Sequence, residues 1–432
     1  MSDGAKTLFP SARPIGSLVV FSDDWGRHPS SCQHLIGQLL DRYPVLWVNT
    51  IGTRTPRFDL QTLRRVSQKL RDWSSRAAHR TAVGQSQSAG PKNLQVVSPK
   101  MWPWFGSPRN RRLNAYLLSR QLSPLIETLP KPVVAVTTLP ITADLPEVLP
   151  AFRWVYYCVD DFSQWPGLDG RTLRQMDHDM IHRADTLIAV SEHLQGMIAS
   201  EGRTSSLLTH GVDLEFWSTG NANSDRGEES RSPIIDGVPR ASSGVSPKVV
   251  FWGVIDRRMD SPTLIQLSRK LPHGTIELIG PQQDPDPAVL ALPNVMLRPA
   301  QAFAELPRIA SQADVLIMPY ANLPVTRAMQ PLKLKEYLAT GKPVVVNRLP
   351  STDEWSDCMD VACTPDDFCG RLIQRLQTGL PDHQKLARQR LRQESWHAKA
   401  QQFETALGQI SDQSSHGADR NVPRNPAPVL EF

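Results

Sequence analysis

The stretch that decides the fold is Gln330-Pro-Leu-Lys-Leu-Lys-Glu-Tyr-Leu-Ala-Thr-Gly-Lys-Pro-Val-Val-Val346. Its pattern predicts a loop, a short helix and then a buried strand. Pro331 suits the first helical position because its ring fixes φ and its missing N–H is not needed there. Gly341 ends the predicted helix, and the β-branched run that follows Pro343 is typical of a strand in a parallel sheet.

The start of this helix predicts an anion site. The free amides after Pro331 point out of the helix N-terminus, where they and the helix dipole favour an anion such as a diphosphate. Lys333 adds a positive charge there. Glu336 lies on about the same face, where its carboxylate can accept hydrogen bonds from ribose hydroxyls. The alternative is an ordinary amphipathic helix in which Lys333, Lys335 and Glu336 are solvated.

The same segment resembles the nucleotide-sugar signature of GT-B glycosyltransferases of the group-1 type. The resemblance covers most of the chain outside the tail and two polar inserts, and it is nearest to teichuronic-acid-type and xanthan-type polysaccharide glycosyltransferases. It implies an α/β fold with two doubly wound Rossmann-like domains facing a cleft. The other matching segments follow the family's order: Ala189-Val-Ser191, His210-Gly-Val-Asp213, Phe251-Trp-Gly-Val-Ile-Asp-Arg-Arg-Met-Asp260, Ile276-Glu-Leu-Ile-Gly-Pro281 and Asp314-Val-Leu-Ile-Met-Pro-Tyr320.

Length and strand pattern agree with two domains. At 432 residues the chain exceeds one ordinary core. Apolar runs predict strands at 17–22, 45–48, 95–97, 133–136, 154–159, 186–190 and 206–209, and then at 248–252, 275–279, 295–297, 314–318 and 344–346. We expect an acceptor-binding domain at 1–217, a flexible polar linker at 218–246, a nucleotide-sugar-binding domain at 247–394, a helix at 395–410 that crosses back to the first domain as in GT-B proteins, and a disordered tail at 411–432.

Two adjacent acids, Asp160 and Asp161, follow a predicted buried strand. Sugar transfer needs a base to take the proton from the incoming hydroxyl. A carboxylate near aromatic rings can serve, because desolvation raises its pKa. We predict Asp161 as this base and Asp160 as the second candidate, since successive strand-end residues point in opposite directions. The alternative is that both acids only cap the loop.

The predicted donor site gathers residues from several strand ends. Gly253 leaves room for a ligand near the backbone. Arg257 or Arg258 is expected to clamp the diphosphate opposite Lys333. With side chains and a helix end neutralising the diphosphate, we expect no metal and no cofactor besides the donor substrate. The full donor-binding set is Gly253, Arg257, Arg258, Gly280, Tyr320, Gln330, Pro331, Leu332, Lys333 and Glu336. Asp260 is expected to cap the following helix.

The predicted acceptor site is the polar loop after the first strand. In similar glycosyltransferases this loop faces the acceptor, so Asp24, Arg27 and His28 are the candidate contacts. The alternative is local capping by Asp24 and Ser30. Many retaining members of the family carry a second glutamate at the position of Ala328, which would contact the donor sugar. The resemblance therefore leaves the donor sugar and the stereochemistry open.

Composition narrows the setting. Five cysteines form no C-x-x-C pair, which favours free thiols in a reducing cytoplasm. No apolar run is long enough for a membrane span or a signal core. The net charge is +5, with eight Lys/Arg against two Asp in 54–80 and five basic residues without an acid in 100–120. With Met101-Trp-Pro-Trp-Phe105, these stretches indicate either contact with an anionic membrane surface or ordinary packing; nucleic acid is disfavoured because no binding motif is present.

The sequence therefore predicts a cytoplasmic glycosyltransferase with a nucleotide sugar as donor and a glycan or lipid-linked acceptor. Peripheral attachment to the inner face of the cell membrane is one of the two interpretations of its basic stretches. Two alternatives remain open. One is a nucleotide-sugar epimerase of the same architecture. The other is a degenerate member that binds a nucleotide sugar as part of a polysaccharide assembly complex, because fold similarity does not establish turnover.

Overall fold

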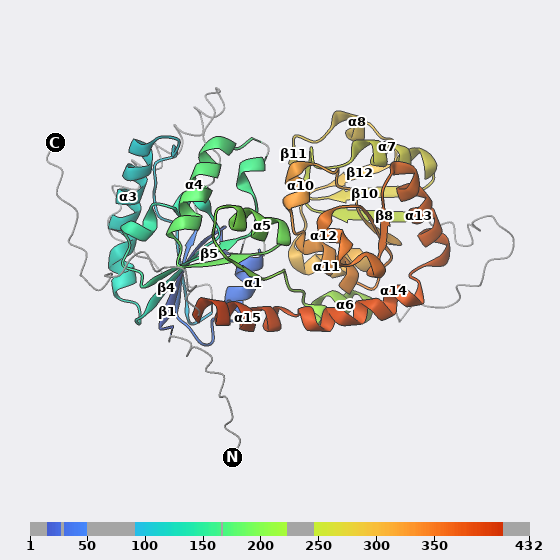
Figure 1. Ribbon diagram of the computed structural model, residues 1–432. Coiled ribbons are helices and arrows are strands. Elements are labelled where there is room, and N and C mark those ends of the chain that lie inside the picture. Colours follow the sequence, from blue (N-terminus) through green and yellow to red (C-terminus); the bar gives the residue numbers. More distant parts are fainter. Residues whose placement is uncertain (1–14, 27–29, 50–90, 166, 223–245, 409–432) are drawn as a thin grey trace, which may run out of the picture.

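The structure, a computed structural model of the chain, describes residues 15–26, 30–49, 91–165, 167–222 and 246–408. These residues form two α/β domains that lie side by side (Figure 1). Arg27 and His28, the basic stretch at 54–80, most of the predicted linker and the predicted tail lie outside the described residues.

The first domain is built on a sheet whose neighbouring strands are all parallel. The strand order is β3-β2-β1-β4-β5-β6-β7. Successive strands are added on one side of β1 up to β3 and on its other side from β4 on, which is the predicted doubly wound arrangement. Both faces are covered by helices, so most strands are continuous hydrophobic runs. The strands are β1 (Ser17–Ser22), β2 (Val45–Asn49), β3 (Leu94–Val97), β4 (Val133–Thr137), β5 (Arg153–Cys158), β6 (Thr186–Ala189) and β7 (Ser206–Leu207).

The helices of the first domain follow the strand ends. The helix α1 begins at Ser31 and ends at Gly37, and residues 38–42 continue as turns. The helices are α1 (Ser31–Gly37), α3 (Pro108–Glu127), η2 (Pro140–Thr142), η3 (Leu145–Glu147), η4 (Phe162–Gln164), α4 (Gly170–Arg183) and α5 (Glu192–Ser200). The next helix, α6 (Leu214–Ala222), packs on the second domain, where Trp217 is part of the core, and its last residues show that the start of the predicted linker is helical.

The second domain repeats this design with a parallel sheet of order β12-β10-β8-β13-β14-β15, which reverses between β8 and β13. Five of its strands were predicted; β15 was not. A separate small ribbon pairs β9 with β11. The strands are β8 (Lys248–Trp252), β9 (Ile255–Asp256), β10 (Thr275–Ile279), β11 (Gln282–Gln283), β12 (Val295–Arg298), β13 (Val315–Met318), β14 (Val344–Asn347) and β15 (Asp360–Ala362).

Two helical stretches of the second domain are divided into shorter units. Residues 303–311 form η5 and α9, and residues 382–408 form α14, η7 and α15. The helices are α7 (Ser261–Lys270), α8 (Pro287–Leu290), η5 (Phe303–Glu305), α9 (Leu306–Ser311), α10 (Pro324–Ala328), α11 (Leu332–Ala339), α12 (Pro350–Asp353), η6 (Ser356–Cys358), α13 (Pro365–Thr378), α14 (Asp382–Ala387), η7 (Arg388–Glu394) and α15 (Trp396–Gly408).

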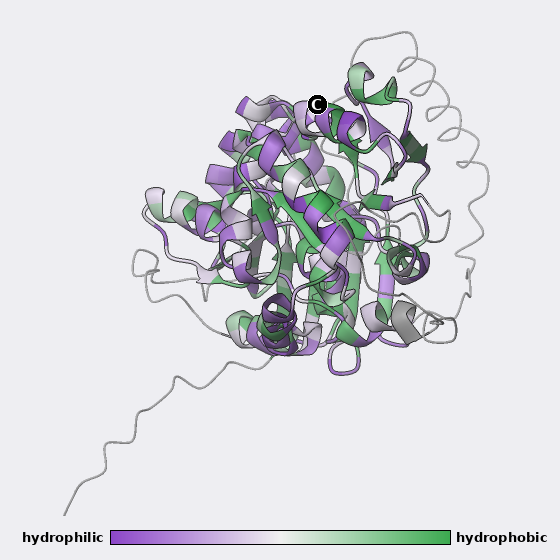
Figure 2. Cartoon of the chain, turned by 90° about the vertical axis from the view of Figure 1, so that its right-hand side faces the viewer, coloured by the Kyte–Doolittle hydropathy of each residue, from purple (hydrophilic) through white to green (hydrophobic). Residues whose placement is uncertain are grey.

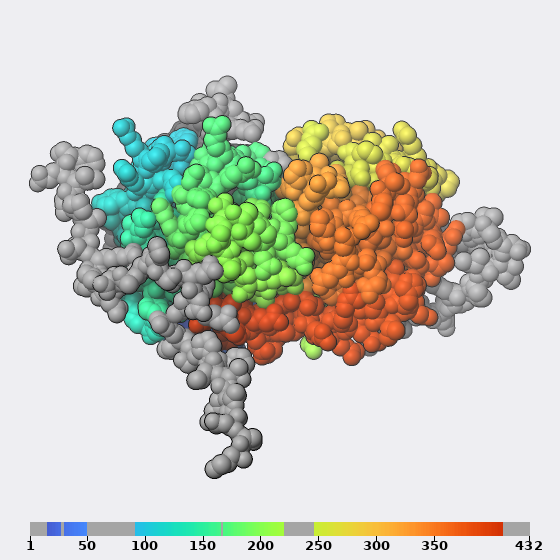
Figure 3. All heavy atoms as spheres, viewed as in Figure 1, coloured from blue at the N-terminus to red at the C-terminus, as the bar shows by residue number. Residues whose placement is uncertain are grey.

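The C-terminal helix α15 crosses back to the first domain, as predicted. Trp396, Phe403 and Leu407 are buried in the core of the first domain, although the chain reaches them from the second. Tyr43 also donates a hydrogen bond of 2.6 Å to Glu404 on α15. Figure 3 shows the red C-terminal segment running beneath both domains, which are in contact above it.

Hydropathy follows this layering. Figure 2 shows green, hydrophobic strands inside a shell of helices that carry purple, hydrophilic residues. Each domain has its own buried core, in agreement with two separately wound sheets. Among the helices of the described residues, none combines the length and hydrophobicity needed to cross a bilayer.

Candidate active site

The predicted donor residues meet where the strand order of the second sheet reverses. β8 and β13 are neighbours at this point; Gly253 directly follows β8, and Tyr320 lies two residues after β13. An isolated bridge pairs Met259 with Tyr320 and closes this corner. In open α/β sheets, ligands bind beyond the carboxyl ends of the strands at such a reversal.

Lys333 reaches into this corner from the first turn of α11. Its Nζ donates a hydrogen bond of 2.5 Å to the Tyr320 hydroxyl. The same ammonium lies 4.7 Å from the centre of the Phe251 ring and 5.0 Å from that of Tyr320, distances at which cation–π attraction operates. The charge is therefore held in place by two aromatic rings, and no carboxylate forms an ion pair with it among the described residues.

Two glycines create the space that Lys333 uses. Gly253 has a φ of +144°, and a Cβ added there would collide with Lys333 Nζ. Gly280 has a φ of +148°, and a Cβ there would collide with the carbonyl oxygen of Gly253. Both positions therefore require glycine, for the backbone conformation and for the close approach.

Glu336 lies one turn after Lys333 on α11, as the spacing predicted. Burial raises the pKa of its carboxyl from 4.5 to about 7, and the positive charge of Lys333 opposes this rise. The carboxyl is therefore poised between its neutral and charged forms near neutral pH. A ligand whose hydroxyls bond to the carboxylate would favour the charged form.

The start of α11 differs slightly from the prediction. Pro331 is the N-cap residue, with a φ of −70° and a ψ of 118°, and the helix begins at Leu332. The first free amides are thus those of Leu332 and Lys333, next to the Lys333 side chain. Gln330 lies beside His210 of the first domain, and Leu332 packs against the first domain's core. Helix α11 therefore begins at the boundary between the domains.

The burial of Lys335 contradicts the alternative in which Lys333, Lys335 and Glu336 are all solvated. Its side chain is 2% exposed and forms an ion pair with Glu394 at the end of η7. Lys335 also donates to the carbonyl oxygen of His210 at 2.6 Å. Lys399 on α15 completes the group by pairing with Glu394 at 2.8 Å. Two lysines and one glutamate thus connect α11 to His210, near the point where the chain leaves the first domain. They also connect α11 to η7 and α15, through which the chain returns to that domain.

The two adjacent arginines have different environments. Arg257 is half-exposed and pairs with Asp284 at 3.2 Å. Arg258 is buried, pairs with Asp256 at 2.8 Å and contacts Met329 Sδ through NH1 at 3.3 Å. Its guanidinium lies 4.7 Å from the centre of the Trp165 ring, which belongs to the first domain. Arg258 therefore links the donor corner to the loop after β5.

That loop carries the predicted catalytic carboxylates, and Asp160 lies on its inner side. Burial raises the pKa of Asp160 to about 7, although the Trp165 indole and the Arg258 charge both lower it. Asp160 Oδ1 and Trp165 Nε1 are both buried without a hydrogen-bond partner. The Trp165 indole is thus close enough to act on the carboxylate but outside hydrogen-bond geometry with Oδ1. A buried carboxylate oxygen that lies near a guanidinium and makes no hydrogen bond of its own can take a proton.

Asp161 has the capping role that the sequence left as an alternative. Its Oδ1 accepts hydrogen bonds from the backbone N–H of Ser163 at 3.0 Å and from the Ser163 hydroxyl at 2.6 Å, and it forms the N-cap of η4. Asp161 also lines a cavity of about 260 Å³ together with Asp177 and His178 of α4. Asp260 likewise caps α7, as predicted, through Thr263.

Asp23, which the sequence did not single out, makes several of the hydrogen bonds that hold the loop after β1. Asp23 accepts hydrogen bonds from the Ser22 and Ser30 hydroxyls at 2.9 and 2.7 Å, and its backbone oxygen accepts from Trp47 Nε1 at 2.9 Å. Asp24 is half-buried at the carboxyl end of β1. Ser30 is the N-cap of α1, which confirms its part of the capping alternative, and the acceptor contact of Asp24 stays a prediction.

Sequence reasoning missed three residues of this site: Trp165, Asp256 and His210. Trp165 and Asp256 hold the Arg258 guanidinium, and buried His210 has its pKa lowered to about 3 by burial and by the charge of Lys335. Asp256 stands two residues before Arg258 in the matched motif, so a local pairing was a readable signal. Trp165 lies 93 residues away from Arg258 in sequence, and only the fold brings the two together.

Comparison with known proteins agrees with this geometry. No protein-family model matches the sequence. The chain is 28% identical over 191 residues to TuaH of Bacillus subtilis strain 168. That protein is named, provisionally, as a teichuronic acid biosynthesis glycosyltransferase. That match spans 43% of this chain and 45% of the relative, so the chain matches under half of the relative's length.

Solved structures match over nearly the whole chain. Sucrose-phosphate synthase from Thermosynechococcus elongatus has a TM-score of 0.61 at 14% identity and covers 90% of this chain and 97% of its own. Anabaena HepE, solved with UDP and glucose, has a TM-score of 0.59 at 13% identity and covers 91% and 100%. An α,α-trehalose-phosphate synthase (UDP-forming) from Burkholderia xenovorans has a TM-score of 0.58 at 14% identity and covers 91% and 100%.

These likenesses cover 90% and 91% of this chain, and the strand order of its two sheets reverses at β1/β4 and β8/β13. We therefore identify the fold of this chain as GT-B, the architecture of the synthases it resembles, and its sequence as similar to that of a teichuronic-acid-type glycosyltransferase.

Proposed function

We propose that this protein is a glycosyltransferase that moves a sugar from a nucleoside diphosphate to a hydroxyl of a glycan or lipid-linked acceptor in polysaccharide biosynthesis. The observation that carries the proposal is the position of Lys333 in the first turn of α11, with its ammonium in the space beside Gly253 at the end of β8. The teichuronic-acid name of the sequence relative supports the class of acceptor.

The donor diphosphate would lie against Lys333 and the N-terminus of α11. Lys333 Nζ now donates to a neutral hydroxyl, Tyr320, and can exchange this bond for a stronger charge-assisted bond to phosphate. The helix end adds amide donors and the positive end of its dipole. Glu336 would accept hydrogen bonds from the ribose, and Gly280 and Tyr320 would line the pocket of the base. We expect the leaving diphosphate to be stabilised here as its charge develops.

Arg258 and Arg257 take different parts in this proposal. Arg258 is committed to Asp256 and stacks on Trp165, so it positions the loop of the first domain beside the donor and adds positive charge to the cleft. Arg257 is exposed and would have to break its ion pair with Asp284 before it could bind the diphosphate. Lys333 is therefore the principal phosphate ligand in our account.

We propose Asp160 as the general base. With a pKa of about 7 it is substantially ionised at neutral pH, yet basic enough to accept the proton of the acceptor hydroxyl as the glycosidic bond forms. The neighbouring Arg258 charge favours the ionised form. Asp161 is held by Ser163 and supports the loop. Whether the anomeric configuration inverts depends on the face from which the acceptor approaches.

The proposal does not require a divalent cation at the donor. An ammonium, a helix N-terminus and a nearby guanidinium supply the positive charge that a metal ion would otherwise provide. The same corner takes no other cofactor, since the donor sugar itself carries the leaving group.

The outer face of the first domain supports contact with an anionic membrane. Arg109, Leu113, Tyr116 and Arg120 are exposed along one side of α3 at helical spacing. Exposed Trp102 lies in the preceding loop, which Asn114 of α3 holds by accepting its backbone N–H at 2.7 Å. Arginines around apolar and aromatic side chains suit a lipid interface. We therefore propose a cytoplasmic enzyme that acts at the inner face of the membrane on a lipid-linked acceptor.

A release assay tests the function. The purified protein is incubated with a panel of nucleotide sugars, with and without lipid-linked acceptors, and nucleoside diphosphate is measured. Release that disappears in Asp160→Ala, while donor binding persists, would support the transferase. Binding without release under all acceptors would instead indicate a scaffold, and interconversion of sugars without release would indicate an epimerase.

A further inference from the structure

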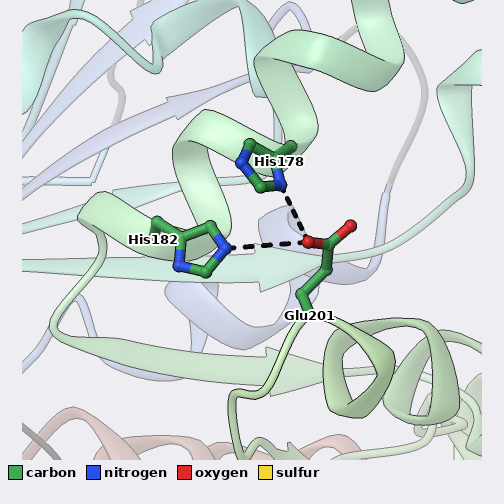
Figure 4. A group of neighbouring side chains, drawn as sticks. All are labelled: His178, His182 and Glu201. Atoms are coloured by element: carbon green, nitrogen blue, oxygen red, sulfur yellow. Dashed lines mark hydrogen bonds and ion pairs between the residues drawn. The ribbon is translucent and has the colours of Figure 1, made fainter.

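A second cluster of polar side chains lies in the first domain, apart from the donor corner. His178 and His182 occupy successive turns of α4, and Glu201 follows the last residue of α5. One ligand atom from each of the three lies within 4.8 Å of the other two. Figure 4 shows the two imidazoles and the carboxylate pointing toward one another from these two elements.

The spacing of these atoms fits a tetrahedral metal ion. Glu201 Oε2 is 2.8 Å from His178 Nδ1 and 3.6 Å from His182 Nε2. Bonds of about 2.0–2.1 Å to Zn²⁺ in tetrahedral geometry would place ligand atoms roughly 3.3–3.4 Å apart. The two observed distances bracket this separation, and the two imidazole nitrogens lie within 4.8 Å of each other, so side-chain rotations would bring all three atoms to one ion.

Hydrogen bonding alone satisfies this cluster poorly. Glu201 Oε2 is within hydrogen-bond distance of His178, but the 3.6 Å to His182 is too long for a hydrogen bond. The imidazole rings lie 4.5 Å apart at 61°, with ring nitrogens of both directed at one carboxylate oxygen. A bound cation would give each of the three ligands a partner at once.

The cluster is open to solvent, as a metal that enters and leaves requires. The side chains of His178, His182 and Glu201 are 45%, 42% and 38% exposed. His178 and Glu201 also line the cavity that Asp161 borders, so a fourth coordination position can face water. Three protein ligands with one open position is a known zinc arrangement, and two imidazoles with one carboxylate suit Zn²⁺ better than the hard cation Mg²⁺.

We propose that His178, His182 and Glu201 form a Zn²⁺ site that clasps α4 to the end of α5. The site is separate from the donor corner, and the proposal does not depend on glycosyl transfer. Bound metal would fix the C-terminal end of α5 against α4, whose first turns pack on η4 beside Asp161. The expected consequence is a stiffer wall for the cavity behind the catalytic loop.

The test is a calorimetric titration of Zn²⁺ into the full, tag-free chain after chelator treatment. The titration is done in a Cys363→Ser background, because Cys363 is an exposed free thiol that can itself bind zinc. We expect one equivalent of Zn²⁺ to bind, no comparable binding of Mg²⁺, and a rise in melting temperature on binding. His178→Ala and His182→Ala are expected to weaken binding at least roughly tenfold.

The matched control is His193→Ala, which removes an exposed histidine of α5 outside the cluster. The control is expected to bind Zn²⁺ as tightly as the parent protein. Co²⁺ substitution should give the visible spectrum of a four-coordinate ion, and His182→Ala should abolish that spectrum. The proposal is overturned if the parent protein binds no Zn²⁺, or if the affinity is the same in His178→Ala, His182→Ala and the parent.

Discussion

Lys333 and Glu336 show how one helical turn carries opposite charges into a confined space. Lys333 is held by Tyr320 and Phe251 and remains available to an anion. Glu336 keeps a pKa of about 7 because burial outweighs the attraction of the nearby ammonium. The two residues thus offer one anchor for phosphate and one acceptor for hydroxyls.

Replacing Asp160 tests the proposed base. Asp160→Asn keeps the side-chain shape and removes the proton acceptor, so we expect kcat to fall by roughly 10²–10⁴-fold with little change in donor affinity. In the parent protein the rate should rise with pH through about 7, because the carboxyl must lose its proton to act as a base. Asp161→Asn should cost less, since Asp161 caps η4. A larger loss in Asp161→Asn than in Asp160→Asn would reverse the assignment.

Glu336 predicts a pH dependence of donor binding. Its carboxyl is neutral below about pH 7 and then accepts hydrogen bonds from ribose less well. We expect donor affinity to weaken as the pH falls from 8 to 6, and proton release to accompany binding at pH 6–7. In Glu336→Gln both effects should be absent. Isothermal titration in two buffers of different ionisation enthalpy measures the proton release directly; an unchanged pH profile in Glu336→Gln would exclude Glu336 as its origin.

The strand ends of the site were predictable from sequence, because Gly253 and the Lys333 helix belong to contiguous motifs with turn and helix-start signals. The choice between Asp160 and Asp161 was harder, since it depends on which carboxylate Ser163 can reach. The contact between Arg258 and Trp165 was not predictable, because residues of two domains create it. The histidine pair of α4 is readable as an i, i+4 pattern, but Glu201 joins it only through the packing of α5.

At the scale of elements, α15 fastens the domains through an aromatic contact with α1. His34 of α1 stacks on Trp396 at a ring separation of 4.5 Å and an angle of 9°. Burial lowers the pKa of His34 to about 4, and Asp213 opposes this change. The neutral imidazole is therefore part of the packing between α1 and the crossover helix.

His34 predicts acid sensitivity of this contact. Because the pKa is about 4 in the folded state and 6.5 in the unfolded state, the unfolded state binds more protons between these values. Stability is present above pH 6.5 and is lost as the pH falls toward 4. In His34→Phe, which keeps the ring but cannot be protonated, we expect the loss between pH 7 and 4 to be smaller by roughly 1–3 kcal/mol. Denaturant unfolding at several pH values measures this difference. The same dependence of the unfolding free energy on pH in both proteins would contradict it.

The shorter elements show where pattern reading stops. β15 is only three residues long and contains Asp360, whose charge would argue against a buried strand. Arg375 of α13 compensates that charge by donating to Asp360 at 2.6 Å. The polar residue is therefore stabilised by a partner from another element, and no local pattern of residues 360–362 reveals it. The strands that read as apolar runs were predicted, including β10, where Lys248 and Arg298 of the neighbouring strands pair with buried Glu277.

At the scale of the whole molecule, a buried ion group joins the domains. Lys335 of α11, Glu394 of η7 and Lys399 of α15 meet at Thr209, which accepts hydrogen bonds from both lysines at 3.2 and 3.0 Å. The backbone also pairs there, since Val212 donates to the carbonyl oxygen of Glu394 at 2.8 Å. Movement of one domain against the other would therefore strain or break these contacts.

Glu394→Gln should destabilise the protein strongly. It leaves the Lys335 and Lys399 ammonium groups buried without a carboxylate, for which a cost of about 3–5 kcal/mol is expected. The double variant Lys335→Met/Glu394→Gln removes one of the stranded charges and should recover part of the loss. Melting temperatures of both variants test this; an unchanged melting temperature in Glu394→Gln would show that the group contributes little.

The central claim is that a nucleoside diphosphate binds where Lys333 meets the N-terminus of α11. Calorimetric titration with UDP, GDP, ADP, CDP and dTDP, each added to the parent protein, Lys333→Ala and the surface control Lys270→Ala, tests it directly. We predict that the tightest nucleotide loses roughly 10–100-fold in affinity, about 1.4–2.8 kcal/mol, in Lys333→Ala and nothing in Lys270→Ala. Equal affinity in the parent and Lys333→Ala, or no binding of any of the five nucleotides, would contradict the account.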